Sequence, residues 1–555
     1  MQLTSYVRSR YFLHVFAAFL ILGSSLFRLS DLGENPSGFF CDEASIGFNA
    51  LSVLETGKDQ YGTSFPAYFR SFGDYKFGTY IYSTALSVGF LGRTNFAVRL
   101  PAALFLVGAI CVSYLLIYVL VGPWSAITAV FILSFEPWLN HASHIGFSLS
   151  AVPLFLGGGV LLFLKGIKRR DCLLESSALP FALAFYTYAT MRLFVPLLVG
   201  LLFLVHISEL KKDRILLLRV GRFVLFLGAL MAPLSYYLLN EDGFLERASY
   251  LAIFSTPYLD HSAGYQYLEP LSQVQPWLQE LLRHDQLKFL PIIVIQYLLH
   301  YSPSYLFISG NPNLRFGTPL FGNHLPLTAI GVVLALLWCL FQRKRPHLLI
   351  FGWVLLAGIP GALTWEDVPH AGRFIMGSYA ISLFAAIGVG ETLRTFWALG
   401  EGRSVLVRLF CVLTFLLLLT PHFAKMKRYY SYYRTEYSTA ASGWMQYGYQ
   451  ESIQYIAHEH EKYQRVVMIM GGLHYLPEIF VLWYSDISPS DWLEEHVLPY
   501  HIEIQEHSES IPAITDNTLY VIAPPLEKVP SELSLLKIIH WEDGIGEAIG
   551  FYNTE

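Results

Sequence analysis

The stretch RLPAALFLVGAICVSYLLIYVLV at residues 99–121 decides the fold class, because it is apolar along its whole length after one arginine. A helix that crosses a bilayer needs about 20 mostly apolar residues. Comparable stretches recur along the chain, at 11–28, 124–140, 149–165, 176–190, 193–208, 216–238, 325–342, 347–363, 374–392 and 404–420. The sequence therefore predicts an α-helical polytopic membrane protein.

The composition excludes several other classes of protein. Of 555 residues, 54% are hydrophobic and 14% are Asp, Glu, Lys or Arg, and the mean hydropathy is +0.44. Soluble domains average about 25% charged residues, so an ordinary soluble enzyme and a disordered scaffold are both excluded. The net charge of −5 supplies no basic face for a nucleic-acid partner.

The basic residues of the short loops predict the orientation. KGIKRR at 165–170, KKDR at 211–214 and RKR at 343–345 each follow an apolar stretch. Lys and Arg are enriched in cytoplasmic loops. If the N-terminus is cytoplasmic, all these clusters lie on the cytoplasmic side, and eleven crossings leave the C-terminal part extracytoplasmic.

Two further apolar regions leave the number of crossings open. The run within 77–97 is short for a crossing and would invert the later topology, so we interpret it as an interfacial helix on the outer face. Two extra crossings around 289–308 would preserve the orientation. We therefore expect about 11–13 spans.

The chain divides into a basic membrane domain at 1–420 and an acidic domain at 421–555. The second part holds 19 acidic and 8 basic residues, and the first holds 23 acidic and 29 basic residues. The membrane domain has two long exterior loops, 29–98 and 239–324. In the acidic part, helical and strand-like runs alternate, which predicts a small extracytoplasmic α/β domain.

The first exterior loop carries the strongest candidates for chemistry. Asp42 and Glu43 lie in CDEASIGFN, and Lys76 follows in FRSFGDYKFG. The two carboxylates suit the first turn of a helix. Alternatively, a carboxylate near the membrane surface can deprotonate a hydroxyl group. The residues alone leave both interpretations open.

The other exterior loops add basic, histidine and tyrosine side chains on the same side of the membrane. Each arginine taken singly also fits the role of an interfacial anchor. Together they can hold a lipid phosphate, with carboxylates nearby for acid–base chemistry. These candidates are His144, Tyr186, Arg192, Arg315, His370 and Arg373.

Seven segments, spread in order along nearly the whole chain, resemble the bacterial GT-C membrane glycosyltransferases of the protein-mannosyltransferase type. This is glycosyltransferase family 39, with the aminoarabinose lipid A transferases as relatives. The segments are DEASIGFNALSVLETGKDQYG (42–62), FRSFGDYK (69–76), FAVRLPAALF (96–105), AFYTYATMRLFVPLL (184–198), SPSYLFISGNPNLR (302–315), LTWEDVPHAGR (363–373) and MQYGYQESIQYI (445–456).

The resemblance implies a GT-C fold in the bacterial cytoplasmic (inner) membrane and an inverting transfer from a polyprenyl-phosphate sugar to an acceptor hydroxyl. Asp42 resembles the catalytic base, with Glu43 as its partner. Lys76 and Arg99 are expected near the donor phosphate or the acidic pair. Arg192, Arg315, His370 and Arg373 match basic positions around the lipid phosphate. The acceptor is a glycan, a lipid or a protein.

The departing polyprenyl phosphate is a good leaving group, and no clear DxD pair is present, so we predict no metal or other cofactor. The five cysteines also lack zinc-binding spacing.

The chain also departs from the family pattern. His144 and Ser148 occupy positions where the family usually has an arginine and an acidic residue, and Phe316 stands where a histidine is common. If these departures are disabling, they favour a catalytically silent member of an envelope complex. A transporter or flippase for a lipid-linked saccharide is a second alternative, since it would explain the spans and the exterior cations equally well. The few mid-span charges and the lack of a duplicated half argue against the transporter.

Overall fold

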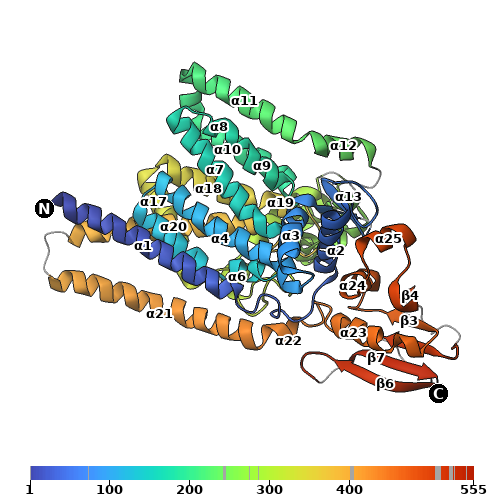
Figure 1. Cartoon of the computed structure of the whole chain (residues 1–555). Coiled ribbons are helices and arrows are strands. Elements are labelled where there is room, and N and C mark those ends of the chain that lie inside the picture. The colour runs from blue at the N-terminus through green and yellow to red at the C-terminus, as the bar shows by residue number, and fades with distance from the viewer. Residues whose placement is uncertain are drawn as a thin grey trace.

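A computed structural model describes residues 2–554 apart from 73, 242–245, 255, 274, 286, 401–404, 507–513, 524–528, 531 and 545–546. A bundle of long helices makes up most of the chain, and a small sheet domain lies beyond one end of it next to α2 (Cys41–Thr56) (Figure 1).

Every apolar stretch predicted to cross the membrane forms a helix. These helices are α1 (Gln2–Leu29), α4 (Asn95–Leu120), α5 (Pro123–Phe135), α7 (Val152–Arg169), α8 (Leu173–Ser176) with α9 (Ala178–Phe185), α10 (Met191–Lys212), α11 (Arg214–Leu230) with α12 (Ala232–Asn240), α17 (Pro326–Gln342), α18 (Arg345–Ala357) with α19 (Ile359–Ala362), α20 (Ile375–Gly400) and α21 (Val405–Thr435). Between α5 and α7 lie the short helices α6 (Pro137–Ser143) and η1 (Ser148–Ala151).

Five helices of the described chain are long and apolar enough to cross a bilayer alone, and the bent pair α11–α12 makes a sixth. Shorter apolar helices cover four more of the predicted stretches. Large apolar side chains point outward from the bundle, with Phe19 71%, Leu225 75% and Phe341 82% exposed. Such exposure suits contact with lipid. The polytopic helical fold is confirmed, and the number of 11–13 crossings stays a prediction.

The segment 29–98, the first of the two loops predicted to be exterior, folds into a compact layer on the bundle. It contains α2 (Cys41–Thr56), a hairpin of β1 (Tyr68–Ser71) and β2 (Asp74–Phe77), and α3 (Gly78–Leu91). The run within 77–97 is thus a 14-residue helix, too short to span, and it packs on α2 and α4.

The segment 239–324, the second loop predicted to be exterior, is also largely helical in its described residues. Gln296 of α16 (Phe289–His300) donates to the carbonyl oxygens of Ala362 and Thr364, which ties this region to the end of α19 and the loop after it. Its elements are α13 (Glu246–Leu251), η2 (Thr256–His261), α14 (Ala263–Ser272), α15 (Pro276–Arg283), α16 (Phe289–His300) and the π-helical turn η3 (Ser304–Ile308).

The C-terminal domain is the predicted α/β unit, built on a five-stranded sheet of order β4-β3-β5-β7-β6. Strand β3 pairs parallel with β4 and β5, and β7 pairs antiparallel with β5 and β6. Helix α21 runs through the predicted boundary at 420/421 before this unit begins. Its elements are α22 (Tyr437–Ala441), α23 (Tyr449–Glu459), η4 (His460–Lys462), β3 (Arg465–Met470), α24 (Pro477–Tyr484), α25 (Pro489–Glu495), η5 (Pro499–His501), β4 (Ile502–Glu506), β5 (Thr518–Ile522), β6 (Leu533–His540) and β7 (Glu547–Thr554).

The buried apolar side chains form two large clusters. One fills the helical bundle. The second is continuous from α2, α3 and the start of α4 into the sheet domain, and it includes Phe48, Val98, Phe480 and Trp483. The layer that contains α2 and α3 therefore shares one core with the C-terminal domain.

Candidate active site

The N-terminus of α2 presents the two predicted carboxylates. Asp42 and Glu43 lie in its first turn, where the helix dipole stabilises negative charge. Adjacent residues on a helix point to different sides. The structure accordingly gives the two carboxylates different surroundings, one sealed and one open.

Glu43 is sealed inside the protein against Arg99 of α4. Its carboxylate accepts hydrogen bonds from the Arg99 Nε at 2.8 Å, the Arg99 Nη2 at 3.0 Å and the Gly146 backbone N–H at 2.7 Å. Both charged side chains are 0% exposed. Arg99 also donates to the carbonyl oxygens of Pro36 and Gly38, each at 2.8 Å. This pair anchors α2 and the preceding loop to the bundle.

Asp42 faces an accessible space and pairs with Lys76 of β2. The Lys76 Nζ lies 3.0 Å from the Asp42 Oδ1, and the two side chains are 15% and 31% exposed. Lys76 also lies 4.4 Å from the centre of the Phe72 ring. The hairpin thus brings a cation to a carboxylate that solvent reaches.

Arg315 approaches the start of α2 from the loop after η3. Its guanidinium lies 5.4 Å from the Phe40 ring centre. The Arg315 Nε donates to the Trp444 carbonyl oxygen and Nη1 donates to the Tyr475 hydroxyl, both at 2.6 Å. Trp444 and Tyr475 belong to the C-terminal part of the chain, so this site lies at the junction of the two domains.

The thiol of Cys41 adjoins this group but is not activated. Burial, and then the charge of Asp42, raise the pKa of Cys41 to about 12. A thiol is a nucleophile only as the thiolate. Asp42 is therefore the group at the start of α2 that is suited to acid–base chemistry.

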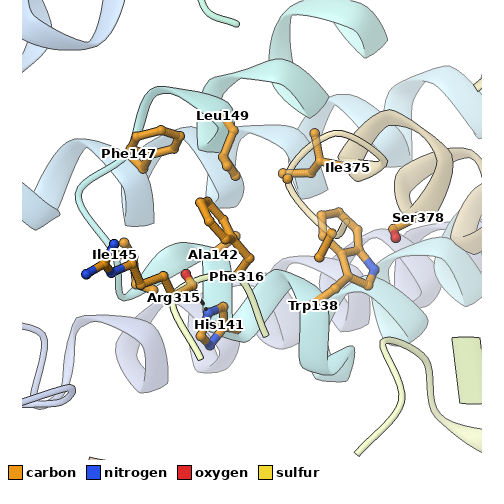
Figure 2. Close-up of a pocket in the computed structure, with 12 residues that line it drawn as sticks. Trp138, His141, Ala142, Ile145, Phe147, Leu149, Arg315, Phe316, Ile375 and Ser378 are labelled. Atoms are coloured by element: carbon orange, nitrogen blue, oxygen red, sulfur yellow. Dashed lines mark hydrogen bonds between the residues drawn. The ribbon is translucent and has the colours of Figure 1, made fainter. Parts of the chain in front are cut away.

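A pocket opens beside Arg315, between α6 and the start of α20 (Figure 2). Its walls are mostly apolar, and His141 Nε2 contacts the Arg315 carbonyl oxygen at 3.1 Å. The lining residues are Trp138, His141, Ala142, Ile145, Phe147, Leu149, Arg315, Phe316, Ala371, Gly372, Ile375 and Ser378. An apolar cavity with one cation at its edge suits an amphiphilic ligand.

Phe316 lines this pocket, and its ring packs against the ring of His370. Their ring centres lie 4.4 Å apart. His370 is buried, and this burial, with the nearby Arg373, holds its pKa well below the ordinary value. Phe316 contributes an apolar wall to the pocket.

His144 lies beneath the site, away from solvent. Its Nδ1 bonds the Asn140 carbonyl oxygen at 2.8 Å, and its ring meets the Tyr433 ring edge-on at 5.4 Å. Burial lowers the pKa of His144 to about 4. The imidazole is therefore neutral near pH 7 and supplies no positive charge there.

Tyr186 and Arg192 lie under the hairpin that carries Lys76. The Arg192 guanidinium lies 5.2 Å from the Tyr68 ring centre and 5.5 Å from that of Phe77. The Tyr186 hydroxyl donates to the Leu230 carbonyl oxygen at 3.0 Å. These contacts support the base of the hairpin.

Arg373 is held within its own loop. Its Nη2 lies 3.2 Å from the Glu366 Oε2, and its Nη1 donates to the Thr364 hydroxyl at 3.0 Å. Of the predicted site residues, the structure thus brings Asp42, Lys76 and Arg315 together at the start of α2. Glu43 and Arg99 anchor that helix from behind.

The sequence reasoning missed the contribution of Trp444 and Tyr475. The segment 445–456 is part of the resemblance. Nothing in the spacing of residues along the chain indicates that Trp444, just before it, and Tyr475, beyond it, contact Arg315 at the start of α2. In the residues that the structure describes, no group of three or more His, Cys, Asp and Glu side chains is arranged to hold a metal ion.

Comparison with known proteins identifies the fold. ArnT from Cupriavidus metallidurans bound to undecaprenyl phosphate superposes with a TM-score of 0.52 at 13% identity, covering 96% of this chain and 97% of that one. The apo state of the same protein gives 0.51, with the same identity and coverage. These matches confirm the predicted GT-C fold of a multi-pass membrane protein.

The oligosaccharyltransferase from Archaeoglobus fulgidus in the apo form gives a TM-score of 0.48 at 13% identity. The match covers 89% of this chain but only 64% of that one. No protein-family model matches the sequence, and neither does any curated protein.

Proposed function

We propose that the protein is an inverting glycosyltransferase, which moves a sugar from a polyprenyl-phosphate donor to an acceptor hydroxyl on the extracytoplasmic side of the membrane. The single observation that carries this proposal is the open Asp42 carboxylate, 3.0 Å from the Lys76 ammonium at the start of α2. The GT-C fold shared with an undecaprenyl-phosphate-bound transferase supports the donor class.

In the proposed reaction, Asp42 takes the proton of the acceptor hydroxyl as its oxygen attacks the anomeric carbon of the donor sugar. The new carbon–oxygen bond forms opposite the bond to phosphate. That bond breaks, and the lipid phosphate leaves with its electron pair. The configuration at that carbon therefore inverts. The proton remains on Asp42, and the lipid phosphate departs as an anion.

Cationic side chains stabilise the charge that develops on the departing phosphate. Lys76 and Arg315 lie at the start of α2 on the side of Asp42, whereas the Arg99 charge is buried against Glu43. A fixed positive charge stabilises a developing anion far more strongly in a partly dry site than the same charge does in water. The apolar pocket beside Arg315 suits the first units of the lipid chain or the apolar face of a sugar.

Replacing Asp42 by Asn tests the proposal directly. The purified protein is reconstituted with a polyprenyl-phosphate sugar, and the transfer of sugar to envelope acceptors is followed by mass spectrometry. We expect turnover to fall roughly 10²–10⁴-fold, since the amide cannot accept the proton. Glu55→Gln is the matched control, because Glu55 is exposed at the opposite end of the same helix.

Near-normal transfer by Asp42→Asn would reject Asp42 as the base. Translocation of the lipid-linked sugar across the bilayer without any transfer would instead favour the flippase. Proton NMR of the product tests inversion, since the anomeric coupling distinguishes the two configurations. The same mass spectra identify the sugar and the acceptor.

A further inference from the structure

The helix that carries Asp42 is capped by the other domain. Phe40 occupies the N-cap position of α2 and provides no side-chain hydrogen bond. The backbone N–H of Cys41 donates instead to the Gln446 Oε1 at 2.8 Å. The first N–H groups of a helix have no partner within the helix. Gln446, 405 residues away in sequence, supplies one.

Gln446 is itself held rigidly. Its side chain is 1% exposed, and its Nε2 donates to the Tyr475 carbonyl oxygen at 2.9 Å. Its backbone φ of 53° lies in the left-handed region, which turns the chain sharply between α22 and α23. This buried amide therefore has a fixed donor and a fixed acceptor, and it transmits the position of the C-terminal domain to α2.

The same short segment also fixes Arg315. Trp444, two residues before Gln446, accepts from the Arg315 Nε, and Tyr475 accepts from Nη1 through its hydroxyl group. One loop of the C-terminal domain thus contacts both sides of the candidate site. It holds the helix that carries the carboxylate and the cation that faces it.

Tight packing keeps the two domains in register. A Cβ atom added to Gly47 of α2 would lie 2.7 Å from the Trp483 ring of α24, so the ring rests directly on the helix backbone. Arg93 donates to the carbonyl oxygens of Trp483 at 2.7 Å and Ile487 at 3.1 Å. A small displacement of α24 therefore also displaces α2.

We infer that Gln446 is a positioning residue for the transfer reaction, through which the C-terminal domain completes the active site by setting Asp42 relative to Arg315. This inference rests on the proposed function, in which Asp42 is the base. The domain is then part of the catalytic unit rather than a separate docking module.

The test uses Gln446→Met in the full-length protein in lipid, because Met has a similar volume and makes neither hydrogen bond. We expect kcat to fall about 10–100-fold, since misplacing a catalytic group by about 1 Å can cost 10²-fold in rate. The KM for the donor should change less than kcat. Gln446→Glu keeps an acceptor for the Cys41 N–H and should recover part of the lost rate.

Trp492→Phe is the matched control. The Trp492 Nε1 donates to the Gln60 carbonyl oxygen at 3.0 Å, so this variant also removes one hydrogen bond between the domains but leaves the start of α2 intact. It should keep kcat within about twofold. Melting temperatures of all three variants are measured alongside the kinetics.

Two outcomes would overturn the inference. One is a Gln446→Met protein with a kcat within about twofold of wild type. The other is an equal loss in Gln446→Met and Trp492→Phe without recovery in Gln446→Glu, which would mark a general effect of domain stability. If Asp42→Asn is inactive in either case, the proposed function stands and only the positioning role fails. If Asp42→Asn is active, the proposed function itself fails.

Discussion

The carboxylate of Glu43 and the guanidinium of Arg99 meet through two hydrogen bonds, of 2.8 and 3.0 Å, in a place where neither side chain touches solvent. The neighbouring Asp42 remains 31% exposed. One residue of the acidic pair therefore holds the helix and leaves the other free for chemistry.

Breaking this pair should destabilise the protein strongly. Glu43→Gln leaves the Arg99 charge buried without its counter-charge, a change that costs about 3–5 kcal/mol in other buried pairs. We expect a clearly lower melting temperature by scanning fluorimetry in detergent. Lys462→Ala, which removes the exposed partner of an ion pair with Glu459, should leave the melting temperature nearly unchanged. An unaltered melting temperature for Glu43→Gln would show that the Glu43–Arg99 ion pair does not contribute to the stability of the protein.

Removing the Lys76 charge should slow transfer more than it weakens donor binding. In Lys76→Met, the departing phosphate loses one stabilising cation, and groups of this kind are worth roughly 10²–10³ in kcat. Lys76→Arg should recover part of the rate. Steady-state kinetics with the reconstituted protein measure both constants. Arg70→Met alters an exposed cation on the same hairpin and should remain active. An unchanged kcat for Lys76→Met would exclude this role.

Filling the contact between α2 and α24 should disturb both stability and activity. In Gly47→Ala the new methyl group would lie 2.7 Å from the rigid Trp483 ring. Overpacking of this kind typically costs about 1–3 kcal/mol. We expect a lower melting temperature together with a lower kcat. Gly23→Ala adds the same methyl group to α1, where no atom lies within 4 Å. A Gly47→Ala protein as stable and active as Gly23→Ala would contradict tight packing at this contact.

The protein should lose stability in mild acid through its buried histidines. His144 has a folded pKa of about 4 against an ordinary value of 6.5. Between these values the unfolded chain binds the extra proton and the folded chain does not, so stability present above pH 6.5 is lost as the pH falls toward 4. In His144→Gln, the melting temperature should depend less steeply on pH across this window.

His458→Gln serves as the control for this titration, because the His458 side chain is 85% exposed. Its melting curve against pH should follow that of the wild type. Equal slopes for wild type and His144→Gln would mean that His144 does not titrate differently on folding.

Much of the architecture can be predicted from local sequence alone. The length and apolarity of 99–121 require a long helix, and every comparable stretch is helical in the structure. The runs at 465–470 and 519–523 predict strands for a similar reason, since their β-branched residues suit a buried sheet. Strands β4 and β7 were missed because their pairing with β3 and β5 is not local, although Ala548, Ile549 and Phe551 of β7 are fully buried.

The sequence by itself determined the membrane fold, the α/β domain and the group of side chains from which a site can be built, because hydrophobic length and residue type act locally. Only the tertiary structure decided their arrangement. It buried Glu43 and left Asp42 open, and it brought Gln446 to the start of a helix 405 residues away. These pairings depend on how α2, α4 and α24 pack together. The spacing of residues along the chain does not determine the distances that this packing sets.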